Sequence, residues 1–260
     1  MGCVVNTWTR LLLEYATGYN TGSVDPADEQ LQRDFVGEAF CSWRSLVIKA
    51  HPVNVKYVNS SSGAPTGSNN VSEVGRFELM AGMDKKCLKE ELTTFDRAVI
   101  LVREPYAAIF AEYIRQWSHT HAGFVYASTF LANLQDWEES SLQMAREYDS
   151  FYQDSLVPML KTMNRTKYLV VKFEDLLNKS TQIDTLYSIV RFISAETAVG
   201  VSLERLVCAF VQADSPSVHR AYSEDRANVS LAYRDARHAD KLWPHLQAFS
   251  DFAGYRKHAI

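Results

Sequence analysis

Three short apolar runs in this sequence are each followed by side chains suited to moving a proton or binding an anion. The residues concerned are Lys49, His51, Arg103 and Glu174. The pKa of an imidazole suits it to act as a general base near neutral pH. A guanidinium group presents paired donors that fit a phosphate dianion. Groups suited to proton transfer or anion binding therefore occur at or just after the end of each apolar run.

The apolar runs predict strands at residues 45–49, 97–102 and 168–173. Pro52 cannot continue a central strand, so His51 lies just past the end of the first one. Strands that alternate with helices and lack hairpin signals predict a parallel sheet covered on both faces. Ligands bind at the carboxyl ends of such strands. We therefore expect His51, Arg103 and Glu174 to converge.

Helix signals fill most of the remaining sequence. Asn6 or Thr7 would cap a first helix over 7–17, and Gly18 suits its end. Pro105 begins an amphipathic helix that continues to Trp117. Residues 19–43 are expected to be irregular and residues 59–70 to form a polar surface loop. Further helices are expected at 127–162, with a kink near Pro158, and at 181–193, 202–213 and 233–252.

The composition is that of an ordinary globular protein. The chain has 260 residues, 47% of them hydrophobic and 22% charged, with a net charge of −4. We expect a single domain over 1–260 and, given the mildly acidic total, no nucleic-acid partner. The longest purely apolar run, residues 98–102, is far shorter than the roughly 20 residues of a membrane-spanning helix. Membrane attachment is expected only through a segment absent from this chain.

The sequence also contains five N-x-S/T triplets, the acceptor motif for N-linked glycans. With ten asparagines in the chain, chance predicts about one or two such triplets. The excess favours a protein of the secretory lumen, and coincidence in a cytosolic protein is the alternative. Four cysteines permit disulfides without requiring them. The triplets begin at Asn59, Asn70, Asn164, Asn178 and Asn228.

Four segments together resemble, in the same order, the signatures of PAPS-dependent sulfotransferases. They are residues 6–14 (NTWTRLLLE), 47–52 (VIKAHP), 100–106 (ILVREPY) and 169–176 (LVVKFEDL). Residues 111–123 (AEYIRQWSHTHAG) resemble more narrowly the WSC-domain-containing sulfotransferases of the Golgi. The resemblance implies an α/β, P-loop-like three-layer fold, with a short parallel sheet flanked by helices. It also implies a location in the Golgi lumen, within a single-pass membrane protein.

The activity implied by this resemblance is transfer of a sulfuryl group from PAPS to a hydroxyl of a glycan. His51 matches the general base of the family. Lys49 matches the lysine that stabilises the sulfuryl or bridging oxygen. The alternative for both residues is a solvent-exposed position at the end of a strand.

The resemblance also assigns the donor contacts. Arg103 matches the arginine that binds the 3′-phosphate, and the alternative is an arginine paired with Glu104 or Glu174. In many relatives a serine stands where this chain has Ala111. In the family, a loop late in the chain folds over the 3′-phosphate, and the resemblance implies that Arg220 makes a second contact with this phosphate. The alternative is that Arg220 is an ordinary surface arginine.

The start of the chain matches the end of the loop that binds the 5′-phosphosulfate. Asn6, Thr7 and Trp8 are the matching residues, and a helix N-terminus there would offer free N–H groups to the anion. His119 and His121 have the spacing of metal ligands, but no third ligand accompanies them, so no metal is expected.

The sequence departs from the family pattern before Asn6. Val5 stands where the family has a glycine, and the preceding strand and basic residue are absent. We therefore expect the first strand of the sheet to be missing, which would leave two neighbouring strands without their shared partner. N-terminal truncation is the favoured explanation.

Two other functions remain open. The first is a catalytically inactive sulfotransferase-like protein that binds a nucleotide bisphosphate or a partner. The second is a P-loop kinase, against which stands the absence of a G-x-x-x-x-G-K-[ST] motif.

Overall fold

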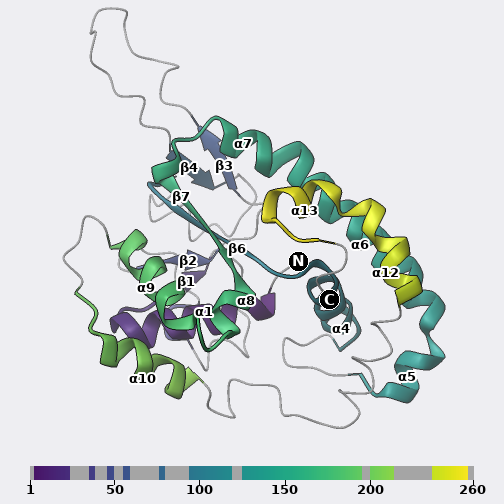
Figure 1. Cartoon of the computed structure of the whole chain (residues 1–260), viewed down its shortest axis with the longest axis horizontal. Coiled ribbons are helices and arrows are strands. Elements are labelled where there is room, and N and C mark those ends of the chain that lie inside the picture. Colours follow the sequence, from purple (N-terminus) through teal and green to yellow (C-terminus); the bar gives the residue numbers. More distant parts are fainter. Residues whose placement is uncertain are drawn as a thin grey trace, which may run out of the picture.

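The computed structural model of the chain is mostly helical, with short strands (Figure 1). The residues that it describes are 3–23, 35–38, 46–49, 55–58, 76–79, 94–118, 125–194, 200–213 and 236–256. No helix among these residues has the length and apolar character needed to cross a membrane.

Helix α1 (Cys3–Thr17) forms because its apolar side chains recur on one face. Trp8, Leu12 and Ala16 are all buried. The helix ends at Gly18, whose φ of 76° suits glycine and whose N–H donates to the Glu14 carbonyl (2.8 Å). The predicted start at residue 7 is wrong by one turn. A capping side chain is worth only about 1 kcal/mol, so Asn6 does not fix where the helix begins.

The clearest strands pair in parallel, as the sequence predicts. β6 (Ala98–Val102) pairs with β7 (Tyr168–Lys172), in a register that joins Val102 to Lys172. A second parallel pair joins β1 (Gly22–Ser23), which lies in a segment expected to be irregular, to β2 (Ile48–Lys49), which lies in the strand predicted at 45–49. In the described part of the chain these two pairs belong to separate sheets.

A three-stranded antiparallel sheet lies between these pairs in the sequence. It contains β3 (Val55–Val58), β4 (Arg76–Leu79) and β5 (Thr94–Phe95), in that order. The expectation of a wholly parallel arrangement is therefore wrong. Its strands have at most four residues, too few for the alternation of polar and apolar residues in β4 to be a clear signal.

Within the described residues 125–162, the helix predicted over 127–162 is interrupted at Asn133 and at a π-helical turn. α4 (Pro105–Ser118) starts at the predicted proline. α5 (Ala127–Ala132) and α6 (Leu134–Phe151) are separated at Asn133, and a π-helical turn, η2 (Tyr152–Leu156), precedes α7 (Val157–Lys161). Pro158 has no N–H to donate to the preceding turn, which explains the widened turn before it.

Helices follow β7 to the end of the described chain. After the 3₁₀ turn η3 (Arg165–Lys167) and β7 come α8 (Phe173–Leu177), α9 (Gln182–Ile193) and α10 (Leu203–Ala213). The last predicted helix is divided into α12 (Ala236–Leu242), the 3₁₀ turn η4 (Trp243–His245) and α13 (Gln247–Ala253). Pro244 within η4 accounts for this division.

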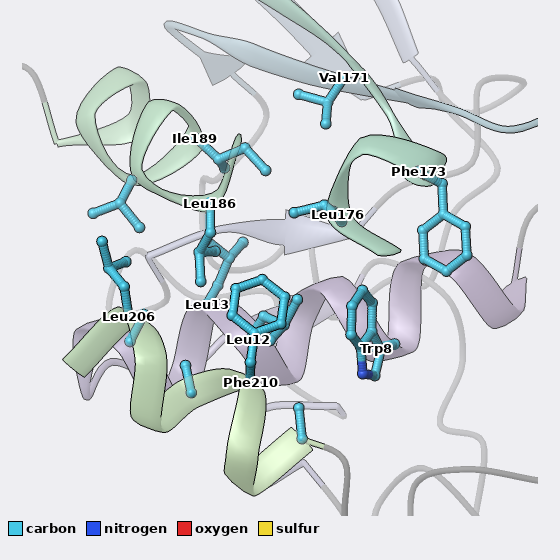
Figure 2. Packing of buried hydrophobic residues seen from close by; sticks show 14 residues of the cluster. Trp8, Leu12, Leu13, Val171, Phe173, Leu176, Leu186, Ile189, Leu206 and Phe210 are labelled. Carbon is cyan, nitrogen blue, oxygen red and sulfur yellow. The ribbon is translucent and has the colours of Figure 1, made fainter. Parts of the chain in front are cut away.

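The two faces of the β6–β7 pair pack against different apolar clusters. Val99 and Leu101 contact the cluster of α1, α8, α9 and α10, part of which is drawn in Figure 2. Ile100 and Val102 belong to the cluster of η2 and α13. Since successive side chains of a strand point to opposite faces, the pair has helices on both sides. This confirms a general α/β arrangement, while the P-loop-like fold stays a prediction.

Candidate functional site

The candidate site lies at the carboxyl ends of β6 and β7. Arg103 and Glu104 directly follow β6, and Phe173 and Glu174 directly follow β7. The register places these ends side by side, because the last residues of the two strands are partners. The strand ends that carry Arg103 and Glu174 are thus adjacent, as the sequence predicts, while His51, the third residue of the predicted set, lies outside the described residues. The same edge of a parallel pair is where α/β proteins usually bind ligands.

The ring of Phe173 contacts two of the residues that the sequence assigned to donor binding. The Arg103 guanidinium carbon lies 5.5 Å from the ring centroid, within the range of a cation–π contact. The Trp8 indole meets the same ring edge-on, with 5.7 Å between centroids and an interplanar angle of 83° (Figure 2). The second turn of α1 and the end of β6 therefore meet at Phe173.

Trp8 is also part of the apolar core. Its side chain is buried and makes a second aromatic contact, with Phe210 of α10 at 5.8 Å. Thr7 is partly buried and lies within α1, one turn past the first helical residue. The N-terminal N–H groups of the helix thus belong to earlier residues than the sequence predicted.

Glu104 caps the following helix. Its carboxylate accepts hydrogen bonds from the backbone N–H groups of Tyr106 (3.0 Å) and Ala107 (2.7 Å) in the first turn of α4. Burial raises the pKa of Glu104, and the nearby Glu174 carboxylate adds to the rise. The two backbone donors and Arg103 act in the opposite direction. A negative side chain of the protein therefore occupies the first N–H groups of α4.

Glu174 joins three parts of the chain. One carboxylate oxygen accepts a hydrogen bond from the backbone N–H of Glu104 (2.8 Å), and the other accepts one from the Tyr255 hydroxyl (2.6 Å). Burial and the bond to Glu174 raise the pKa of Tyr255. Glu174 thus fixes the backbone next to Arg103 and ties it to the segment after α13.

Lys172 strengthens this link. Its ammonium group donates to the Gly254 carbonyl (3.3 Å) and lies 4.8 Å from the centre of the Tyr255 ring. Gly254 has a φ of 67° and ends α13 in the left-handed conformation. The last residue of β7 therefore contacts the turn that places Tyr255 over Glu174.

Two further tyrosines, Tyr148 of α6 and Tyr152 of η2, lie near these groups. The hydroxyl groups of Tyr148 and Tyr152 are 3.5 Å apart. Burial raises the pKa of Tyr148 to about 12, and the charges of Arg103, Glu104 and Glu174 also act on it. The described groups at these strand ends are therefore one guanidinium group, two carboxylates and neutral phenols.

Several predicted residues lie wholly or partly outside this description. His51, Arg220, His119 and His121 are not among the described residues. Lys49 is, as the last residue of β2, where its backbone pairs with Ser23. Asn6 lies within α1, and the positions of the Asn6 and Lys49 side chains are not described. Their proposed roles stay predictions.

The described contacts of Arg103 bear on the alternative that it pairs with a neighbouring carboxylate. Arg103 lies close enough to Glu104 to oppose the rise of its pKa, so the two charges interact. Within the described ranges, no group of three His, Cys, Asp or Glu side chains could hold a metal ion.

Sequence reasoning missed the roles of Glu104, Lys172 and Tyr255. Glu104 could have been found, because an acidic residue directly before a proline is a common start of a helix. Tyr255 had no such signal, since it follows Glu174 by 81 positions.

A second buried polar cluster lies away from these strand ends. The Arg10 guanidinium group forms an ion pair with Glu38, donates to the Thr21 hydroxyl (2.8 Å) and lies 4.1 Å from the centre of the Phe35 ring. Side-chain exposure is 4% for Arg10 and 1% for Glu38. Such burial, with an ion pair, a hydrogen bond and a ring contact inside the cluster, indicates a structural role that joins residues 35–38 to α1 and β1.

Comparison with known proteins finds relatives at low identity, among them three named as WSCD family members. A Drosophila melanogaster protein named as a WSCD family member is 30% identical over 166 residues, covering 57% of this chain and 41% of that protein. A Drosophila pseudoobscura pseudoobscura protein of the same family name is 31% identical, with 57% and 42% covered. An Aedes aegypti WSCD family member is 26% identical over 254 residues, covering 87% of this chain and 62% of that protein.

The chain thus spans less than two thirds of the length of these relatives. No family model matches the chain. No solved structure matches it either.

Proposed function

We propose, from this similarity to WSCD family members, that the chain is a PAPS-dependent sulfotransferase domain of the WSC-domain-containing kind. It would transfer a sulfuryl group to a hydroxyl of a glycan, in the Golgi lumen and on a P-loop-like fold. The four ordered sequence segments and the low-identity relatives support this proposal.

The observation that carries the proposal is the meeting of Trp8 and Arg103 at the Phe173 ring. These residues belong to three different segments of the family pattern, which are far apart in the sequence. Donor binding requires the start of α1 and the end of β6 to lie together, because the two phosphate-bearing ends of one nucleotide would contact them. Their common contact with Phe173 supports such a binding site.

In the proposed reaction the protein positions the reactants and neutralises charge. His51 would accept the proton of the glycan hydroxyl while that oxygen bonds to sulfur. The bond from sulfur to the phosphate oxygen breaks, and adenosine 3′,5′-bisphosphate leaves. Lys49 would stabilise the charge that develops on the sulfuryl or bridging oxygen. Arg103 would hold the 3′-phosphate through charged hydrogen bonds.

The arrangement around Glu104 adds a condition to this reaction. The carboxylate of Glu104 already accepts hydrogen bonds from the first N–H groups of α4. The guanidinium group of Arg103, rather than this helix end, must then supply the attraction for a phosphate.

Binding of adenosine 3′,5′-bisphosphate to the full chain, measured by calorimetry, tests the proposal. We expect Arg103→Ala to weaken binding by roughly 10- to 150-fold, because charged hydrogen bonds contribute about 1.5–3 kcal/mol. Arg191→Ala, on an exposed position of α9, makes the same change of charge and is the control. Wild-type protein that does not bind the bisphosphate, or binding that Arg103→Ala leaves unchanged, would refute the donor site.

Transfer of labelled sulfate from PAPS to a glycan mixture then separates enzyme from non-enzyme. We expect His51→Ala to abolish transfer and to keep bisphosphate binding, because it removes only the proton acceptor. A fully active His51→Ala protein would remove His51 from the mechanism.

The second candidate function is an inactive protein that binds the nucleotide bisphosphate. Val5 at the position of the family's glycine favours this candidate. Bisphosphate binding by the wild-type chain without any transfer would establish it. Binding of ATP in preference to the bisphosphate would instead support a kinase.

A further inference from the structure

Two of the five N-x-S/T triplets lie in the described residues, and both are at the surface. Asn164, Arg165 and Thr166 form the first, between α7 and β7. Asn178, Lys179 and Ser180 form the second, between α8 and α9. All six residues are exposed, so an added group at either asparagine would project into solvent without displacing a packed side chain.

The turn at Asn178 joins the asparagine to the hydroxyl residue of its triplet. The carboxamide oxygen of Asn178 accepts hydrogen bonds from the backbone N–H (3.0 Å) and the hydroxyl (2.8 Å) of Ser180. The Asn178 backbone carbonyl accepts from Thr181 and Gln182, which starts α9. Within the described residues, the Asn178 amide nitrogen donates no hydrogen bond, so substitution on that nitrogen breaks none of these contacts.

The turn at Asn164 is held by the same kind of hydrogen bond. Its carboxamide oxygen accepts a hydrogen bond from the Thr166 N–H (3.0 Å) and caps η3. The Asn164 backbone is extended, with φ of −67° and ψ of 132°. Two turns with the same contact between the first and third residues therefore present their amide nitrogens at the surface.

We infer that Asn178 and Asn164 carry N-linked oligosaccharides. The amide nitrogen of each asparagine would bond to the anomeric carbon of an oligosaccharide carried on a polyprenol diphosphate. The bond from that carbon to the diphosphate oxygen breaks, the polyprenol diphosphate leaves, and the amide nitrogen loses one proton. The excess of N-x-S/T triplets over chance supports the same modification from the sequence.

Asn164 lies away from the candidate site. β7 runs from the end of α7 to the start of α8 (Figure 1), so Asn164 precedes the strand whose opposite end carries Phe173 and Glu174. A strand of this length spans about 16 Å. Asn178 directly follows α8 and lies one helical turn from Glu174, whose backbone carbonyl accepts a hydrogen bond from the Asn178 N–H (2.9 Å). An oligosaccharide at Asn164 would leave the strand ends accessible, whereas one at Asn178 would lie near them.

Mass spectrometry of the protein isolated from the cells that make it tests the inference. Peptide N-glycosidase in heavy-oxygen water converts a glycosylated asparagine to a labelled aspartate. We expect the label at positions 164 and 178. Unlabelled asparagine at both positions, in recovered peptides, overturns the inference, and a label at only one overturns it for the other.

Variants of the full chain expressed in the same cells give a second readout. Ser180→Ala and Thr166→Ala should each remove one oligosaccharide, seen as a step in gel mobility that enzymatic deglycosylation abolishes. Ser180→Thr keeps the acceptor motif and should keep the wild-type mobility. Equal mobility of Ser180→Ala and Ser180→Thr overturns the assignment of Asn178. Neither readout depends on sulfuryl transfer, so the proposed function can fail while this inference stands.

Discussion

The side chain of Glu104 has two roles, as the cap of a helix and as a charged group at the candidate site. It caps α4 through two backbone N–H groups, and it lies beside Arg103 and Glu174 at the candidate site. The cap stabilises its charged form, and burial acts more strongly against that form. Glu104 is therefore the residue through which pH should affect both the fold and anion binding.

The pH dependence of stability follows from this shift. The folded protein has a higher Glu104 pKa than the unfolded chain, whose value is near 4.5. The contribution of Glu104 is therefore fully present below that value and is lost as pH rises through the raised pKa. We expect Glu104→Gln to lack this loss, as measured by urea unfolding at a series of pH values.

The control for that experiment is Glu139→Gln, the same substitution at an exposed position of α6. It separates the effect of losing any carboxylate from the effect of losing the buried one. If Glu104→Gln and Glu139→Gln show the same dependence on pH, burial of Glu104 does not govern its titration.

Among the elements, the contact of residues 35–38 with β1 depends on one glycine. A Cβ atom at Gly37 would lie 2.1 Å from the Thr21 carbonyl oxygen, which is closer than any real contact. The buried Arg10–Glu38 pair holds the same segment in place, so it cannot easily move away. The fit of this segment against β1 therefore requires the absence of a side chain.

We expect Gly37→Ala to destabilise the fold by at least about 1–3 kcal/mol, the usual cost of overpacking. The free energy of unfolding in urea measures this change. Gly200→Ala is the matched control, because a Cβ atom there would meet nothing within 4 Å. Its effect should stay within about 0.5 kcal/mol. Equal stability of the two variants would show that residues 35–38 do not pack on β1 in this way.

At the scale of the whole molecule, the chain after α13 completes the site that the central strands begin. Tyr255 reaches Glu174 through a short hydrogen bond, and Lys172 contacts both Gly254 and the Tyr255 ring. The apolar cluster that contains Phe249 lies between α13 and the β6–β7 pair and supports this placement. Truncation before Gly254 would thus disturb a site formed by residues much earlier in the sequence.

Tyr255→Phe tests this long-range link. It removes the hydroxyl donor from a Glu174 oxygen and keeps the ring, so we expect a loss of about 1.5–3 kcal/mol in the free energy of unfolding. Tyr187→Phe, at a 47% exposed position of α9, is the control and should change stability by less than about 0.5 kcal/mol. Unaltered stability of Tyr255→Phe would mean that the bond to Glu174 contributes nothing to the fold.

The sequence by itself determined the parts of this protein that local patterns control. The apolar runs of β6 and β7 gave strands in the expected places, Pro105 started α4, and Gly18 ended α1. It also indicated that Arg103 and Glu174 would lie together, because parallel strands bring their carboxyl ends to one edge. Such features depend on spacing and backbone chemistry within a few residues.

Only the tertiary structure decided which distant groups complete the site. The contact of Trp8 with Phe173, the bond from Tyr255 to Glu174 and the burial that raises the Glu104 pKa all join separate segments. The short antiparallel strands and the first turn of α1 likewise escaped prediction. Packing energies exceed the weak local preferences at those places, and packing is a property of the folded chain as a whole.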